Sequence, residues 1–283
     1  MAEAAPVKAP VNCPVDTKEK SKERVNGWPA NPDKHLKFIP SPRRLRIKFN
    51  GETIADTLAP MMMREGRHLP VYYLPRRDVR MDLLVPTDND SFCPYKGAAS
   101  YFSIRVGELV SENAVWSYEA PFPEVAEIKD YLAFYWDRVD QWFEEDDEIF
   151  KHPRDPYHRV DVINSSRPVT VTLKGAEVAN SASARFAFET NHPTRYYLPR
   201  DDVKMELLAP SEFTSTCPYK GDAVYFSARI DGELIEDVAW CYPDPIAECP
   251  KIRGRICFFN ERVDAITVDG VVQPKPETKW SRD

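Results

Sequence analysis

Histidine, glutamate and lysine recur at matching places in the two halves of this chain, and these side chains are suited to proton transfer. Only five histidines are present, and two of them, His68 and His192, each follow a glutamate by three residues, Glu65 and Glu189. A carboxylate that orients an imidazole forms an acid/base pair, and histidine titrates near neutral pH. The same spacing is compatible with a histidine that fills a structural niche in both halves.

A lysine lies inside a Cys-Pro-Tyr-Lys-Gly turn in each half, at Lys96 and Lys220. Proline and glycine account for the turn but not for the lysine. A partly desolvated ammonium there could neutralise an enolate, a phenolate or a carboxylate. A turn lysine that faces solvent is the alternative. Cys93 and Cys217 open the same turns, and we expect small buried thiols there, because a nucleophilic cysteine needs a neighbouring base.

Aromatic residues alternate along the strands expected on either side of these turns, which would place several of them on one face. They could line a pocket for a flat phenolic or carboxylated small molecule, with hydroxyl donors and a guanidinium. They could equally form the second side of a core. The set comprises Tyr72, Tyr73, Tyr101, Arg105, Trp116 and Tyr118 in the first half, and Tyr196, Tyr225, Arg229, Trp240 and Tyr242 in the second.

The two halves are copies of each other. The stretch VYYLPRRDVRMDLL at 71–84 returns as RYYLPRDDVKMELL after a shift of 124 residues, and the same shift carries 93–97 onto 217–221. One register holds from about Leu45 to Asp140, with a single-residue slip near Gly107. Such self-similarity indicates a tandem duplication. A length of 283 residues agrees with two domains.

Each copy opens with period-two alternation before a glycine turn, as in residues 45–49 before Asn50-Gly51, which predicts a β-hairpin. Pro75 and Pro199 are placed to begin short helices. A further helix is expected at 123–129, with a shorter or absent counterpart in the second copy. The predicted fold class is mainly β with short helices: two tandem small curved-sheet or barrel domains.

The flanking segments are charged and contain proline, which predicts partial disorder near the N-terminus, chiefly over the first 25 residues. Trp28 and the stretch 35–40 are expected to tie the remainder of this extension onto the first domain. We expect the two repeats to pack on each other. The predicted boundaries are an N-terminal extension at 1–43, a first domain at 44–140, a linker at 141–168, a second domain at 169–272 and a C-terminal tail at 273–283.

Composition excludes several classes of function. The net charge is −7 and no basic stripe is present, so a nucleic-acid partner is not expected. No apolar stretch could span a membrane, and the first residues lack an apolar signal segment. Six cysteines without a C-x-x-C pair predict free thiols in a reducing, cytoplasmic compartment and no metal site. No glycine-rich phosphate loop is present, so no cofactor is expected.

At these residues the chain resembles the DUF427 family, as a tandem two-copy member. The shared elements are the early Asn-Gly hairpin, Glu65-x-x-His68 before a Tyr-x-Pro stretch, the CPYKG turn, a tyrosine-rich strand and a Trp-x-Tyr strand. The resemblance covers nearly all of both repeats, although this chain inserts residues between His68 and Tyr72.

The resemblance also brings a nucleotidyltransferase-like label, which implies paired acids that hold Mg²⁺ beside a Gly-Ser turn. No Gly-Ser-x-x-x-Asp-x-Asp pattern is present. The acid pairs Asp78 with Asp82 and Asp202 with Glu206 are expected to be solvated charges on short helices.

The leading hypothesis is a cofactor-independent acid/base enzyme, an isomerase, cyclase or lyase, that acts on a small aromatic or phenolic metabolite. A chalcone-isomerase-type ring closure is one example. Glu65 would orient His68 as the base, and Lys96 or Arg105 would hold the enolate. Tyr72 or Tyr118 would donate a hydrogen bond. A non-catalytic small-molecule-binding or scaffold protein and a nucleotidyltransferase-like enzyme are the alternatives.

Overall fold

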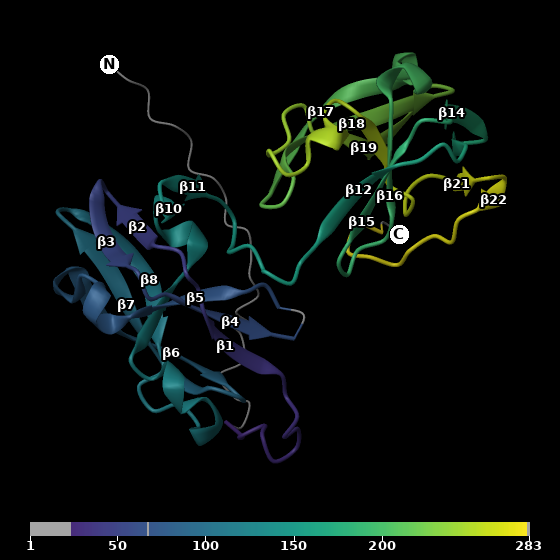
Figure 1. The fold of residues 1–283 in the computed structure, drawn as a ribbon. Coiled ribbons are helices and arrows are strands. Elements are labelled where there is room, and N and C mark those ends of the chain that lie inside the picture. The colour runs from purple at the N-terminus through teal and green to yellow at the C-terminus, as the bar shows by residue number, and fades with distance from the viewer. Residues whose placement is uncertain (1–23, 67, 282–283) are drawn as a thin grey trace, which may run out of the picture. The chain divides into compact units, whose positions relative to one another are not determined.

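The computed structural model describes residues 24–66 and 68–281, and the chain divides into two compact units, Met1–Pro153 and Arg154–Asp283 (Figure 1). Each unit holds one seven-stranded and one four-stranded antiparallel sheet, with equivalent strand orders in the two units. The predicted mainly β class and its duplication are confirmed. Every sheet that the described residues form is open, so the curved-sheet form applies and the barrel does not.

In the first unit the seven-stranded sheet has the order β1-β4-β5-β9-β8-β7-β6, and the four-stranded sheet has the order β11-β10-β2-β3. The strands are β1 Leu36–Pro40, β2 Leu45–Phe49, β3 Glu52–Thr57, β4 Met61–Glu65, β5 Val71–Pro75, β6 Leu84–Cys93, β7 Gly97–Val106, β8 Leu109–Ser117, β9 Tyr131–Phe134, β10 Gln141–Glu144 and β11 Asp147–Ile149.

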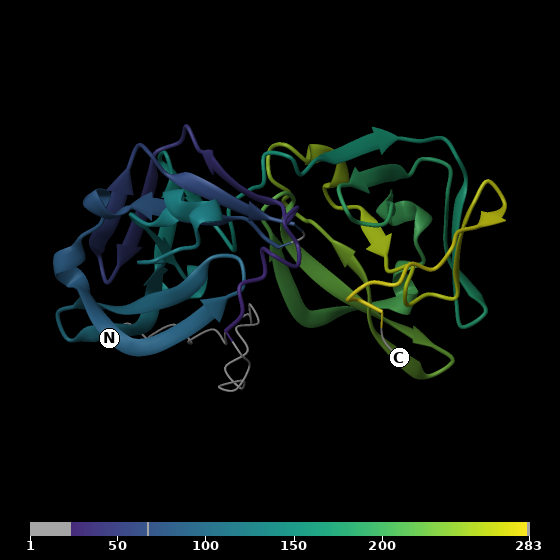
Figure 2. The same ribbon diagram turned by 90° about the horizontal axis from the view of Figure 1, so that it is seen from below.

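In the second unit the corresponding orders are β12-β15-β16-β20-β19-β18-β17 and β14-β13-β21-β22. The long hairpin β17–β18 is strongly bent (Figure 2, green), and its pairing register shifts between Pro210 and Thr214. The strands are β12 Val160–Asn164, β13 Val169–Leu173, β14 Ala176–Ser181, β15 Arg185–Glu189, β16 Arg195–Leu198, β17 Leu208–Cys217, β18 Gly221–Ile230, β19 Glu233–Cys241, β20 Ile256–Phe258, β21 Ala265–Val268 and β22 Val271–Val272.

The predicted glycine turns form as expected. Asn50 and Gly51 both have positive φ values, 47° and 77°, and join β2 to β3. Lys174 and Gly175 repeat the geometry at 49° and 73°. Two successive residues with positive φ match the right-handed twist of the flanking strands, which is why this turn closes a two-residue hairpin.

The helical segments are all short 3-10 turns. Pro75 and Pro199 immediately precede η1 and η5, and Pro123 begins η3. The counterpart of η3 in the second unit is the shorter η7, as predicted. The turns are η1 Arg76–Asp78, η2 Met81–Leu83, η3 Pro123–Ile128, η4 Trp136–Arg138, η5 Arg200–Asp202, η6 Met205–Leu207 and η7 Pro250–Ile252.

The segments outside the predicted domains contribute strands, because their apolar residues complete the sheets. Strands β10, β11 and β12 lie within 141–168, the expected linker; β10 pairs with β2, and β12 pairs with β15. Trp142 on β10 is buried in the core. Strand β1 lies in the expected extension and pairs with β4, while Trp28 donates to the Tyr95 carbonyl oxygen at 2.9 Å. The predicted disorder falls mostly on residues 1–23, outside the described residues.

Each seven-stranded sheet has an apolar cluster on both faces. In the first unit one cluster joins the large sheet to the four-stranded sheet and includes Tyr72, Leu45 and Ile104. The other cluster covers the opposite face and includes Tyr73 and Tyr101. Adjacent residues of a strand point to opposite faces, so Tyr72 and Tyr73 enter different cores.

Two further expectations concern compartment and membrane. The five cysteines among the described residues are free thiols, whereas Cys13 lies outside them. Across residues 24–66 and 68–281, no helix has the length and apolar character needed to cross a membrane.

Candidate functional site

The aromatic face, for which a pocket lining and a core were equal alternatives, packs into a core. Tyr73, Tyr101 and Tyr118 are 2%, 5% and 6% exposed and pack with Trp28 and Ile128. The second unit repeats this arrangement with Tyr197, Tyr225, Trp240 and Tyr242, which pack with Cys249, Ile252, Cys257 and Phe259. The second interpretation of these aromatics, as one side of a core, therefore matches the structure.

Several predicted site residues lie apart from this core and from one another. Tyr72 lies in the opposite core and donates to Glu144 at 2.7 Å, and Tyr196 packs edge-on against Phe186. Arg105 and Arg229 are exposed. Trp116, half-buried, packs on Tyr135 with ring centroids 4.6 Å apart.

A glutamate–lysine ion pair does form in both units. Lys96 Nζ lies 2.6 Å from Glu65 Oε2, and Lys220 Nζ contacts Glu189 Oε2 in the same way. Both lysines are only 8% exposed. A lysine is rarely buried to this extent unless its charge is paired, and here the glutamate is the partner. The structure therefore brings together two candidate residues of each copy to which the sequence had given separate roles.

The CPYKG turn fixes the lysine. Gly97 has a φ of 103°, and an added Cβ would lie 3.3 Å from the Ala120 carbonyl oxygen, so glycine is required there. The Lys96 backbone N–H donates to the Cys93 carbonyl oxygen at 3.2 Å, and its carbonyl accepts from Phe122 at 3.2 Å. These bonds hold the lysine in the turn between β6 and β7, where its side chain reaches Glu65 at the end of β4.

Another basic side chain reaches the same carboxylate, from the residue two places before the first strand of each seven-stranded sheet. Lys34 Nζ lies 3.4 Å from Glu65 Oε1 and 4.8 Å from the centroid of the Tyr95 ring. In the second unit His158 takes this place, because the repeat shift carries Lys34 onto it. Sequence reasoning missed both residues, although extending the repeat register upstream of Leu45 would have paired them.

His158 makes the closest imidazole–carboxylate contact of this cluster. Its Nε2 donates to Glu189 Oε1 at 3.0 Å, and its ring stacks on Tyr219 at 4.2 Å between centroids, with 27° between planes. The His158 side chain is 14% exposed and that of Glu189 is 9% exposed. The histidine is thus oriented by a carboxylate and confined by an aromatic ring.

The predicted Glu-x-x-His spacing closes a turn in both units. The backbone N–H of His68 donates to the Glu65 carbonyl oxygen at 2.8 Å, and that of His192 to Glu189 at 3.0 Å. His192 Nδ1 then lies 4.0 Å from Glu189 Oε1 and donates to the Thr190 carbonyl oxygen at 2.9 Å. His68 and His192 are both exposed, and the His192 ring also lies beside that of His158, with 5.8 Å between centroids.

The three neighbours of Glu189 form the residue cluster that we call the second-unit site: His158, His192 and Lys220. Burial raises the pKa of Glu189, but the Lys220 ammonium and the two histidines more than offset it, so the pKa lies below its ordinary value. Burial likewise opposes the shift at Glu65, where Lys96 and Lys34 lower the pKa. Both carboxyl groups are therefore ionised at neutral pH.

The buried tyrosines are poor proton donors and acceptors. Burial raises the pKa of Tyr118 and Tyr242 far above the ordinary value for tyrosine, and nearby ionisable groups add to the increase. A phenolate in this core is therefore excluded at neutral pH.

One metal-ligating set exists among the described residues. His158, Glu189 and His192 each offer a ligand atom, and these atoms lie within 4.8 Å of one another. The acid pairs considered for Mg²⁺ instead face separate partners. Asp78 accepts from Thr57 at 2.7 Å, whereas Asp82 binds Arg80 through two contacts, at 2.8 and 2.6 Å.

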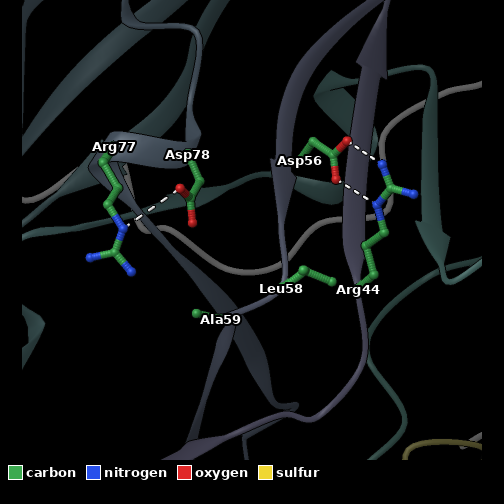
Figure 3. A pocket seen from close by; sticks show the side chains of 6 residues that line it. All are labelled: Arg44, Asp56, Leu58, Ala59, Arg77 and Asp78. Carbon is green, nitrogen blue, oxygen red and sulfur yellow. Dashed lines mark hydrogen bonds and ion pairs between the residues drawn. The ribbon is translucent and has the colours of Figure 1, made fainter.

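A shallow hollow of about 520 Å³ lies elsewhere on the first unit (Figure 3). Arg44 binds Asp56 through two contacts, at 2.7 and 2.5 Å, and Arg77 lies 3.7 Å from Asp78. Its charged groups are paired with one another, and none of the candidate site residues lines it. The lining residues are Arg44, Asp56, Leu58, Ala59, Arg77 and Asp78.

Comparison with known proteins agrees with the duplicated fold. No curated protein matches the chain. One family model, labelled NTP_transf_9 and described as a domain of unknown function (DUF427), matches twice, over residues 37–145 and 161–269. Each match begins inside the first strand of a seven-stranded sheet and ends before the last strand of the unit, β11 or β22. The chain therefore belongs to the DUF427 family and carries two copies of its domain.

Proposed function

We propose that this protein is a cofactor-independent acid/base enzyme whose catalytic group is the imidazole of His158 in the second-unit site. The observation that carries the proposal is the 3.0 Å contact between His158 Nε2 and Glu189 Oε1, while Lys220 holds the other carboxylate oxygen. A carboxylate that binds one ring nitrogen fixes the tautomer and leaves the other nitrogen to take a proton from substrate.

The remaining residues have distinct roles in this proposal. Lys220 is a positioning residue, because it contacts the carboxylate and acts on His158 only through Glu189. His192 supplies a second imidazole, with its ring centroid 5.8 Å from that of His158. Its side chain is 32% exposed, so it is accessible to a substrate that approaches from solvent. One imidazole would accept the proton and the other would return it.

The class of substrate follows from what surrounds the cluster. The aromatic face of the sheet is filled, so the substrate binds outside it, beside Tyr219 and Trp280, which pack on His158 and His192. Flat aromatic or phenolic compounds stack well on such rings. Proton transfer on a small aromatic or phenolic carbonyl compound, by an isomerase, cyclase or lyase, is the reaction that this arrangement supports.

The first copy has a different role in this proposal. Lys34 stands where His158 does, so Glu65 faces two ammonium groups and no oriented imidazole. An ammonium paired with a carboxylate at neutral pH does not act as a base. The first copy would keep the ion pair as a structural element, and the second would carry the chemistry.

Two proton-transfer reactions test the proposal with the full chain. One is ring closure of an ortho-hydroxychalcone, followed by loss of its absorbance; the other is deuterium exchange at the α-carbon of small aryl ketones, followed by NMR. We expect His158→Ala to lower the rate by about 100-fold or more. His35→Ala removes an exposed histidine of the first unit and should leave the rate unchanged.

Binding without turnover of any compound in the panel would instead support a small-molecule-binding protein. Loss of turnover in His68→Ala but not in His158→Ala would move the site to the first copy and overturn the assignment. A circular dichroism spectrum of each variant confirms that the fold is intact.

A further inference from the structure

We propose that the second unit binds one divalent transition metal ion of the zinc class at His158, Glu189 and His192. Their ligand atoms lie within 4.8 Å of one another, with separations of 3.0 Å and 4.0 Å from Glu189 Oε1 to the nearer nitrogens of His158 and His192. Bonds of about 2.0–2.2 Å in a tetrahedral site place ligand atoms roughly 3.3 Å apart. The observed spacing therefore needs small side-chain movements, and His192 Nδ1 must also give up its hydrogen bond to the Thr190 carbonyl oxygen.

The ligands are held in place before any ion binds. The His158 ring stacks on Tyr219, and the His192 ring packs 5.7 Å from Trp280 between centroids. Lys220 holds Glu189 through Oε2, which leaves Oε1 toward the histidines. Ligands that are already ordered lose less entropy on binding, and contacts of this kind tune metal affinity.

The ligand types select the class of ion. Two imidazoles and one carboxylate suit zinc, cobalt, nickel and copper, whereas calcium and magnesium prefer oxygen ligands. In the absence of metal, a proton lies between His158 Nε2 and Glu189 Oε1, and the ion would replace it. Three protein ligands leave a fourth coordination position for water.

Lys220 limits the affinity. Its ammonium contacts the same carboxylate and repels a second cation, so we expect weaker binding than at sites whose carboxylate has no cationic neighbour. Imidazole must also be unprotonated to bind, so affinity falls as the solution becomes acidic. Both effects predict exchangeable metal rather than a permanently bound ion.

The first copy provides an internal control. The residue equivalent to His158 is Lys34, so Glu65 contacts two ammonium groups. Their positive charges repel a metal ion, so we expect no metal binding at Glu65. His68 is the counterpart of His192 but has no such partner histidine, because the chain has lysine at that place. One ion per chain is therefore the expected stoichiometry.

The test uses the full untagged chain without substrate. Co²⁺ is added and its visible absorption followed, and Zn²⁺ binding is measured by calorimetry. We expect one equivalent of each ion. His158→Lys, which reproduces the first copy, and His192→Ala should each weaken binding on the order of 100-fold. His68→Ala should bind as the parent does, and circular dichroism shows whether each variant is folded.

Absence of binding by the parent chain overturns the proposal, and so does parental affinity in folded His158→Lys. The inference rests on geometry alone and not on the proposed acid/base function. Metal binding without turnover removes only that function, whereas turnover without metal binding removes only the metal site. If both hold, Zn²⁺ inhibits turnover, because an ion on Nε2 of His158 leaves the ring proton on Nδ1, the nitrogen that would otherwise accept the proton from substrate.

Discussion

Lys34 and His158 occupy equivalent positions in the two copies, and each contacts Oε1 of the glutamate that pairs with the turn lysine. Lys34 Nζ lies 3.4 Å from Glu65 Oε1, and His158 Nε2 lies 3.0 Å from Glu189 Oε1. Both also lie over the tyrosine of the CPYKG turn. The duplication has thus kept the glutamate–lysine pair and the turn tyrosine in both copies and replaced one ammonium side chain by an imidazole.

Exchanging these two residues should exchange the chemistry without unfolding either unit. Because a lysine already fits this place in the first copy, we expect His158→Lys to change the stability of the second unit by less than about 1 kcal/mol. Adding Lys34→His to that variant should restore part of the proton-transfer rate. Thermal unfolding and the chalcone assay measure the two effects. A His158→Lys chain that no longer folds would contradict the equivalence.

Removal of the buried ammonium should destabilise the first unit strongly. Lys96→Met leaves the Glu65 carboxylate without its closest partner, and we expect a loss of about 3 kcal/mol. Adding Glu65→Gln should recover part of it, because no unpaired charge then remains. Hydrogen exchange of the β4 and β6 amides reports on this unit alone. Lys34→Met, whose side chain is 22% exposed, is the control and should cost less than about 1 kcal/mol.

The second unit should depend on a buried arginine that the first unit lacks. Arg195 binds Glu261 through two contacts of 2.7 Å, and its guanidinium lies 5.4 Å from the ring centroids of both Trp240 and Trp280. The equivalent residue in the first copy is Val71. Truncating one partner of a buried charge pair typically costs about 3–5 kcal/mol, so we expect this loss for Arg195→Met.

Tryptophan fluorescence during urea unfolding measures that loss, since Trp240 and Trp280 flank the guanidinium. Arg229→Met removes an exposed arginine of the same unit and should change the free energy of unfolding by no more than about 0.5 kcal/mol. Equal effects of the two substitutions would show that the buried pair contributes nothing specific.

The free energy of unfolding should decrease at acidic pH, because Glu65 and Glu189 have lowered pKa values in the folded chain. In the folded chain, burial raises the pKa of Glu189, but Lys220 and the histidines lower it further, to below the ordinary value of 4.5. The folded state therefore binds fewer protons than the unfolded state in this range. The contribution of Glu189 is fully present above pH 4.5 and is lost as the pH falls through the folded-state pKa.

Glu189→Gln should remove the contribution of this one carboxyl group to the difference in bound protons between the unfolded and folded states. The slope of unfolding free energy against pH below 4.5 should then decrease by at most about 1.4 kcal/mol per pH unit. Urea unfolding at a series of pH values measures it. Glu206→Gln replaces an exposed carboxylate and serves as the control. An acid limb that is unchanged in Glu189→Gln would rule out this glutamate as its source.

Much of the architecture could be predicted because it is encoded locally and then repeated. Alternation before Asn50-Gly51 and the 124-residue shift predicted a mainly β chain of two similar units. The CPYKG turn needs glycine for its positive φ, so the place of Lys96 was also fixed by local sequence. The strands that lie outside the predicted domain bounds, β1 and β10 to β12, are short and three of them pair with strands far along the chain.

The sequence by itself determined the duplication, the hairpins and the candidate residues Glu65, Lys96 and their repeats. Only the tertiary structure decided that Tyr72 and Tyr73 enter different cores and that the tyrosine face is filled. Alternation specifies that neighbours point to opposite faces of a strand, but not what covers each face. His158 joined Glu189 for a related reason: long-range pairing of β12 with β15 brings together residues that no local pattern connects.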